Sequence, residues 1–172
     1  MSLSESSGPI GPSSRRAFGA GLVGLTLSAC GFELRRPPKL AFASIALTGF
    51  APRSPLAEEL RRQLGQQVQV LESPAQAAVV LQALDDRREK GVVASTAAAQ
   101  VRELTLRLKF HFRAHTPGGR ELIPRVELLL SRDLSYSEVS ALAKEQEEAE
   151  LYRGMQTDVV AQVLRRLAAV VV

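Results

Sequence analysis

The clearest pattern in the chain lies in Val101 to Ala114, where polar and apolar residues alternate strictly from Glu103 onward. A period of two residues is that of a β-strand with one buried and one solvent-facing side. The turn sequence Thr116-Pro117-Gly118-Gly119 follows, and the alternation resumes from Leu122 to Leu130. We therefore expect an antiparallel hairpin, in which Pro124 is tolerated near an edge or at a strand end. The apolar positions of its first strand are Leu104, Leu106, Leu108, Phe110 and Phe112, and the polar ones are Glu103, Thr105, Arg107, Lys109, His111 and Arg113.

The segment before this hairpin predicts a strand, a helix and a short extended stretch. Lys39 to Leu47 is β-compatible and is bounded by turn-forming residues. Ser54 is a good N-cap, and the helix that it begins is expected to run from Pro55 to about Gln67. Val68 to Leu71 is a candidate for a second extended stretch that ends at Pro74. The one-sided spacing of this helix comes from Leu56, Leu60 and Leu64.

The segment from Ala77 to Val93 allows two interpretations. Val79 to Leu84 is β-compatible, but the polar run from Asp85 to Lys90 follows it directly. This run either continues the strand or forms a loop before Val92 and Val93. We favour a charged loop for the Asp85-Asp86 pair, because adjacent strand residues point to opposite sides and cannot act as an acid pair.

A long helix is predicted from Glu138 to about Val170, where Gly154 is the sole Gly or Pro residue. At 1.5 Å per residue it spans about 45 Å. Its apolar stripe consists of Leu142, Ala149, Tyr152, Met155, Val159, Val163 and Leu167. The whole pattern predicts an α+β fold, with two helices packed on one face of a mostly antiparallel four-stranded sheet.

The N-terminal thirty residues have the pattern of an export signal. Arg15-Arg16 precedes Ala17 to Ala29, an uncharged stretch too short to span a bilayer. The sequence Leu27-Ser28-Ala29-Cys30 resembles the lipobox of bacterial lipoproteins. The resemblance implies cleavage before Cys30 and acylation of its thiol, and two or more acyl chains give stable anchoring. The alternative is an ordinary apolar segment that ends in a buried cysteine.

This N-terminal pattern divides the chain into a removed signal peptide, residues 1–29, a lipidated spacer, residues 30–38, and one folded domain, residues 39–172. Arg15-Arg16 fits part of a twin-arginine signal. A general secretory signal fits equally well, so the export route stays open. Gly31 follows the cysteine, where an Asp would favour retention in the inner membrane, and we therefore expect the outer membrane.

Four short motifs stand out along the chain: Cys30 to Arg35, Ser131-Arg132-Asp133 with Tyr136, Ala143 to Glu148, and Asp158 to Leu167. Together they resemble those of the LPS-assembly lipoprotein family LptE, also called RlpB. The family commonly begins its mature chain with Cys-Gly-Phe-x-Leu-Arg-Gly, and here Arg36 replaces the final Gly. The resemblance implies two helices on a four-stranded sheet. It also implies that the protein acts with the β-barrel LptD as a plug and assembly partner, and takes part in lipopolysaccharide transport to the outer leaflet.

The composition and motifs of the chain exclude most kinds of catalytic site and metal site. With 172 residues and one cysteine, the chain can form neither an internal disulfide nor a Cys-rich zinc site. His111 and His115 lie four apart on a predicted strand, which separates them by about 13 Å, so we expect two surface histidines rather than a metal site. We find no nucleophile motif and no phosphate-binding loop. We therefore expect a non-enzyme without a cofactor.

Charge is unevenly distributed along the chain. From Asp85 to Arg125 there are nine basic and five acidic residues, whereas from Asp133 to Asp158 there are seven acidic and two basic. Both regions can simply be solvated surfaces. The functional interpretation is that Arg107, Lys109 and Arg113 present a basic face to lipopolysaccharide phosphates. Nucleic acid fits poorly, because an exported lipoprotein meets little of it and this face lacks stacking aromatics.

The alternative to lipopolysaccharide transport is a structural role in the cell envelope. A structural or envelope-maintenance lipoprotein of the outer membrane would share the acylated Cys30 and the fold, but would have no barrel partner and no lipid ligand.

Overall fold

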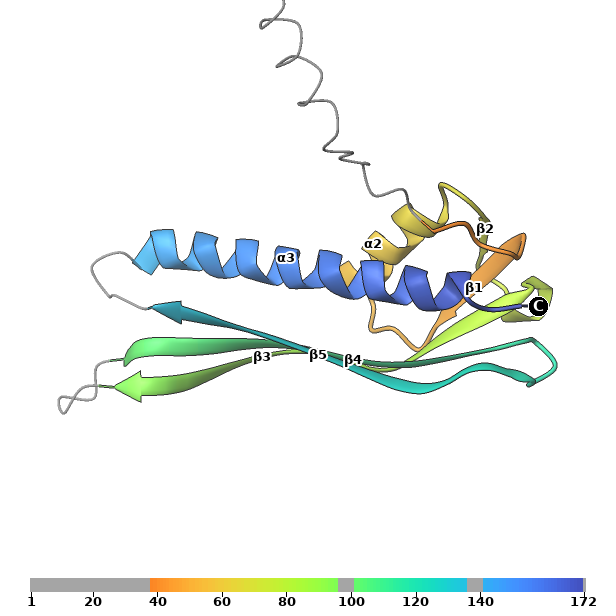
Figure 1. Cartoon of the computed structure of the whole chain (residues 1–172). Helices are drawn as coiled ribbons and strands as arrows, with labels where there is room; N and C mark the ends of the chain where they lie inside the picture. The colour runs from red at the N-terminus through yellow and green to blue at the C-terminus, as the bar shows by residue number, and fades with distance from the viewer. Residues whose placement is uncertain (1–37, 96–100, 136–140, 172) are drawn as a thin grey trace, which may run out of the picture. The chain divides into compact units, whose positions relative to one another are not determined.

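The computed structural model describes residues 38–95, 101–135 and 141–171, which lie in one compact unit, Pro37–Val172. Two α-helices lie on one face of a five-stranded sheet with the strand order β2-β1-β3-β4-β5 (Figure 1). This confirms the predicted α+β class. The elements in chain order are β1 (Ser44–Thr48), α2 (Pro55–Leu64), β2 (Gln69–Leu71), the 3-10 helix η2 (Pro74–Gln76), β3 (Val79–Ser95), β4 (Val101–His115), β5 (Glu121–Ser135) and α3 (Ala141–Ala168).

The prediction of a mostly antiparallel four-stranded sheet was wrong in two respects. The candidate stretch after the first helix is a genuine fifth strand, β2. Strand β1 is parallel to both of its neighbours, with Ile45 aligned with Val70 on one side and with Val79 on the other. The sheet is therefore mixed, since only the β3-β4 and β4-β5 pairs are antiparallel. Strand β1 also begins later than expected, at Ser44.

The predicted hairpin is confirmed. Strands β4 and β5 pair antiparallel along nearly their whole length, and Gly119 closes the turn by donating its backbone N–H to Thr116 O at 2.9 Å. Pro124 lies on β5, which is an edge strand, where the pairing register shifts between Phe112 and Ala114. This is where a residue without a backbone N–H is tolerated.

The polar run after Leu84 continues β3, so the charged-loop interpretation of Asp85-Asp86 was wrong. The register shifts between Ala83 and Asp85, which makes Leu84 the extra residue of a bulge. The bulge reverses which positions face the helices. Before it, the helix-facing side chains are Val79, Leu81 and Ala83, and after it they are Asp86, Arg88 and Lys90.

Helix α2 begins as its sequence predicts. Ser54 Oγ accepts from the backbone N–H of Ala57 at 3.2 Å and donates to Asp86 Oδ2 at 2.5 Å. The cap therefore joins the start of α2 to β3. The helix ends at Leu64, three residues before the expected end, because Gly65 and the turn beyond it lead directly into β2.

Helix α3 is long but only partly buried. Its buried residues are Tyr152, Met155, Gln156, Val159, Val160, Val163, Leu164 and Leu167. Leu142 is 71% exposed and Ala149 is also exposed, so the predicted stripe was wrong at its first two positions. None of residues 141–150 is buried. The first third of α3 therefore covers the sheet without contributing apolar residues to the core.

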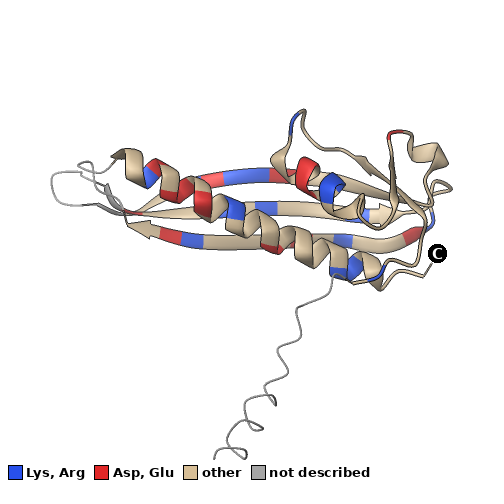
Figure 2. Cartoon of the chain, turned by 90° about the horizontal axis from the view of Figure 1, so that it is seen from above, with Lys and Arg blue, Asp and Glu red and all other residues tan. Residues whose placement is uncertain are grey.

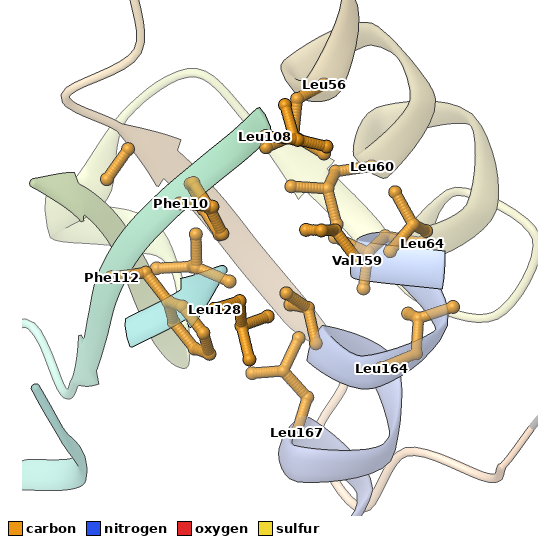
Figure 3. Close-up of a cluster of buried hydrophobic side chains, with 14 of the residues drawn as sticks. Leu56, Leu60, Leu64, Leu108, Phe110, Phe112, Leu128, Val159, Leu164 and Leu167 are labelled. Atoms are coloured by element: carbon orange, nitrogen blue, oxygen red, sulfur yellow. The ribbon is translucent and has the colours of Figure 1, made fainter. Parts of the chain in front are cut away.

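The core lies between the sheet and the two helices. Side chains from α2 and from the C-terminal part of α3 meet the inward residues of β4 and β5 (Figure 3). The rings of Phe110 and Phe112 stack with their centroids 5.3 Å apart, and Phe50 lies 5.8 Å from Phe110. The labelled members of this cluster are Leu56, Leu60, Leu64, Leu108, Phe110, Phe112, Leu128, Val159, Leu164 and Leu167.

Candidate functional site

The face of strands β3, β4 and β5 that points away from the helices is called the outer face here. Alternation along β4 buries Leu106, Leu108 and Phe110 in the core, so the side chains between them point outward. Arg107, Lys109 and Arg113 therefore share the outer face. Arg107 and Arg113 are exposed, and Lys109 is half-buried.

These cations have different neighbours on the adjacent strands. Arg107 stands between Glu89 on β3 and Ser131 on β5. Lys109 stands between Arg87 and Leu129. Leu129 is 57% exposed, so this row places two cations beside an uncovered apolar side chain.

Two arginines of the outer face donate hydrogen bonds to neighbouring side chains, Arg113 to a neutral one and Arg87 to an acidic one. Arg113 Nε donates to Gln82 Oε1 at 2.8 Å. Arg87 Nη2 donates to Asp85 Oδ2 at 2.7 Å, and this guanidinium lowers the pKa of the Asp85 carboxyl below its usual value. The outer face therefore carries mixed charge, with cations concentrated along its central rows.

His111 lies on the outer face but is only 8% exposed, so the expectation of a surface histidine was wrong there. Asp85 and Glu127 flank it in the direct register of β3 and β5. Its Nε2 lies 3.2 Å from Glu127 Oε1 without the alignment of a hydrogen bond. The contact with His111 lowers the pKa of Glu127. Arg125 Nη2 lies 3.3 Å from His111 Nδ1, and this packing covers the ring.

His115 is half-buried at the end of β4, with Nδ1 2.8 Å from Thr116 O. Within the described residues no group of three or more His, Cys, Asp or Glu side chains is arranged to hold a metal ion. Asp85 and Asp86 point to opposite faces, since Asp85 pairs with outer-face Arg87 and Asp86 with Ser54 of the helical layer.

Part of the basic charge between Asp85 and Arg125 does not reach the outer face. Beyond the Leu84 bulge, Arg88 and Lys90 turn toward α3 and contact its polar side chains. Lys90 Nζ lies 2.9 Å from Glu148 Oε2. Figure 2 shows the acidic positions of α3 concentrated in its N-terminal half, above this part of β3.

Sequence reasoning missed this layer between β3 and α3, which we call the polar layer and define as Asp86, Arg88, Lys90, Tyr152 and Gln156. Arg88 Nη2 donates to Gln156 Oε1 at 2.8 Å, and its guanidinium lies 5.1 Å from the Tyr152 ring centroid. Tyr152 Oη donates to Glu89 O at 2.7 Å. A cleft of about 510 Å³ opens beside it, lined by Arg88, Lys90, Glu145, Glu148, Ala149 and Tyr152.

Two further findings concern the membrane. No α-helix in residues 38–95, 101–135 and 141–171 combines the length and the apolar character needed to cross a bilayer. Cys30 and the export signal of residues 1–29 lie outside the described residues.

The model of the LptE family, described as lipopolysaccharide-assembly, matches residues 42–167. The uncharacterized lipoprotein B from Nitrosomonas europaea is 29% identical, with a TM-score of 0.69, covering 81% of this chain and 91% of that protein. The rare lipoprotein B from Shewanella oneidensis is 21% identical, with a TM-score of 0.61 and coverage of 73% and 94%. The minor lipoprotein from Acinetobacter baumannii is 22% identical, with a TM-score of 0.61 and coverage of 76% and 93%. No curated protein matches the sequence.

Proposed function

The chain belongs to the LptE family of lipopolysaccharide-assembly proteins, and on this basis we propose that it helps deliver lipopolysaccharide to the outer leaflet of the outer membrane. The observation that carries the proposal is the family match over residues 42–167, which spans nearly all of the described fold. The role is one of binding and assembly, without catalysis and without a cofactor.

The proposed location is the periplasmic side of the outer membrane, with the chain anchored through acylated Cys30. The lipobox-like sequence that ends at Cys30 supports this attachment. Replacing the residue, Cys30→Ala, should abolish incorporation of labelled fatty acid and release the protein from the membrane fraction. Unchanged labelling or unchanged membrane retention would contradict the attachment.

The proposed partner is the outer-membrane β-barrel LptD, which the chain would enter as a plug and whose assembly it would support. The lumen of such a barrel is polar, so a plug needs a largely hydrophilic surface. The outer face and the N-terminal part of α3 both have such a surface. This partnership follows from the family resemblance, and the hydrophilic surface supports it.

The proposed ligand surface is the outer face around Arg107, Lys109 and Arg113. Lipopolysaccharide carries phosphates and acyl chains, so it suits a surface that combines cations with an exposed apolar side chain. Lys109 and its neighbour Leu129 provide this combination. Hydrogen bonds from such cations to phosphate oxygens are charge-assisted and therefore stronger than those between neutral groups.

Charge reversal tests this surface. The double variant Arg107→Glu, Lys109→Glu should weaken binding of purified lipopolysaccharide by about tenfold at low salt, because charge-assisted contacts are lost and replaced by repulsion. The difference should shrink at high salt, because exposed charges are screened. Arg61→Glu, Arg165→Glu is the matched control, since both residues are exposed on helices. Equal binding by the outer-face variant and the parent chain would remove these residues from the site.

A further inference from the structure

The imidazole ring of His111 is buried on the outer face with one nitrogen unsatisfied. The residue is 8% exposed, and its Nε2 has no hydrogen-bond partner. A buried polar atom without a partner is unfavourable, and such atoms are rare in native proteins. The surroundings of this ring therefore point to a second state, in which Nε2 is better satisfied.

The contact with Arg125 determines which nitrogen of neutral His111 carries the proton. Arg125 Nη2 lies 3.3 Å from His111 Nδ1, within hydrogen-bond distance. A guanidinium can only donate hydrogen bonds, so Nδ1 has to be the acceptor. The proton of the neutral ring is therefore on Nε2, which lies 3.2 Å from Glu127 Oε1 without the alignment of a hydrogen bond. The neutral ring thus holds Arg125, but its own N–H is poorly placed.

Protonation of His111 reverses these two contacts. Both ring nitrogens then carry a proton and donate. The new Nδ1–H would point at Arg125 Nη2, which is also a donor, and two positive groups would face each other at 3.3 Å. The Nε2–H gains a charge-assisted attraction to Glu127 instead. A protonated ring therefore keeps Glu127 and releases Arg125. An imidazole ordinarily takes up this proton between about pH 5 and 8.

The charged groups around the ring come from three strands, since the two helices lie on the other face of the sheet. They are Asp85 and Arg87 on β3, Lys109 and Arg113 on β4, and Arg125 and Glu127 on β5. The hydrogen bond from Arg87 lowers the pKa of Asp85, and the contact with His111 lowers the pKa of Glu127, so both carboxyls stay ionised at neutral pH. Each carboxylate is thus engaged, Asp85 by Arg87 and Glu127 by the protonated ring. A released Arg125 is therefore available to another anion.

We propose that Arg125 is a further lipopolysaccharide-contacting residue of the outer face and that His111 controls it. The neutral ring holds the guanidinium, and protonation of the ring releases it toward a phosphate. This inference rests on the proposed lipopolysaccharide surface, and it extends that surface from Arg107 and Lys109 to β5. A guanidinium suits this role, because it can contact two phosphate oxygens at once. Lipopolysaccharide would then bind more tightly as the pH falls.

Nitrogen NMR of the histidine side chains in the full-length chain tests the switch without any ligand. At about pH 8, His111 should be the Nε2–H tautomer, and acidification to about pH 5 should protonate its Nδ1 as well. His115 is the internal control. Its Nδ1 lies 2.8 Å from the acceptor Thr116 O, so its neutral ring should carry the proton on Nδ1. A neutral His111 with its proton on Nδ1, or a ring that does not titrate over this range, would overturn the proposal.

Binding of purified lipopolysaccharide at two pH values tests the consequence. The parent chain should bind about tenfold more tightly at about pH 5.5 than at about pH 7.5, because one charge-assisted contact is added. His111→Gln should remove this gain, because an amide does not titrate, and any ratio left in this variant belongs to the phosphates of the ligand. Arg125→Gln should lose the gain as well. His115→Gln makes the same change at the control histidine and should keep it.

The outcomes separate this inference from the proposed function. A parent chain that binds no lipopolysaccharide at either pH would overturn the proposed surface, and the role of Arg125 with it. Binding with the same pH ratio in the parent and in His111→Gln would contradict control by His111 but leave the surface standing. A full gain in Arg125→Gln would rule out Arg125 as the contact. His111→Asn gives a second side chain that does not titrate, so that one misfolded variant does not decide the result.

Discussion

Among the glycines that the structure describes, Gly49 makes the closest approach to neighbouring backbone. It follows β1 with φ at 77°, a region that favours glycine. A Cβ built there would lie 2.2 Å from the carbonyl oxygen of Ala83, which is backbone and cannot move aside. The close approach of this turn to β3, just before the Leu84 bulge, therefore requires glycine.

Gly49→Ala should lower the free energy of unfolding by about 3 kcal/mol, because it adds a backbone clash to an unfavourable φ. Gly119→Ala is the matched control. Gly119 has φ at 89°, but a Cβ added to it would meet nothing within 4 Å, so the cost should be about 1 kcal/mol. Urea denaturation of both variants measures the difference, and equal losses would show that the contact with Ala83 does not matter.

For single residues, the sequence predicts which face of the sheet a side chain points to better than it predicts how deeply that side chain is buried. Strict alternation was sufficient to place Arg107, Lys109 and Arg113 on one face. It could not predict that His111, on the same face, would be covered by Arg125 and Glu127, because that depends on the register of a neighbouring strand.

At the scale of elements, the polar layer connects β3, α2 and α3 through side-chain hydrogen bonds. Gln156 is 9% exposed and connects three elements. Its Oε1 accepts from Arg88 on β3, and its Nε2 donates to Pro55 O at the start of α2 at 3.0 Å. The layer thus fixes α3 against both β3 and α2 where the apolar core ends.

Gln156→Leu should lower the free energy of unfolding by about 1–3 kcal/mol, because the buried Gln156 side chain loses two hydrogen bonds, one to Pro55 O and one from the Arg88 guanidinium. Gln146→Leu makes the same change at an exposed position of α3 and should stay within about 0.5 kcal/mol of the parent. Thermal unfolding monitored by circular dichroism would compare them. A Gln156→Leu variant as stable as the control would mean that the layer contributes little.

The sequence did not reveal this layer, for a physical reason. The charged run after Leu84 fits a loop as well as a strand, unless a bulge is known to turn every second charge toward a helix. Nothing in the residue type of Leu84 indicates that the bulge is there. Strand direction was also hidden, because alternation in β1 is the same whether its neighbours run parallel or antiparallel. The hairpin of β4 and β5 was predictable because its turn residues adjoin it.

For the molecule as a whole, the fold and the family agree. The described unit places two helices on one face of the sheet, and the outer face of β3, β4 and β5 carries exposed charged and polar side chains. This outer face is where we propose that lipopolysaccharide binds. The N-terminal Cys30 would hold it at the membrane.

The most direct test of the proposed role is co-purification from detergent-solubilised outer membranes of the source cells. We expect the tagged chain to recover one large β-barrel protein in a stable complex, identified by mass spectrometry as an LptD. An unrelated outer-membrane lipoprotein with the same tag is the control, and it should not recover this barrel. Recovery of the chain alone, under conditions that preserve other barrel complexes, would contradict the account and favour an envelope-maintenance lipoprotein without a barrel partner.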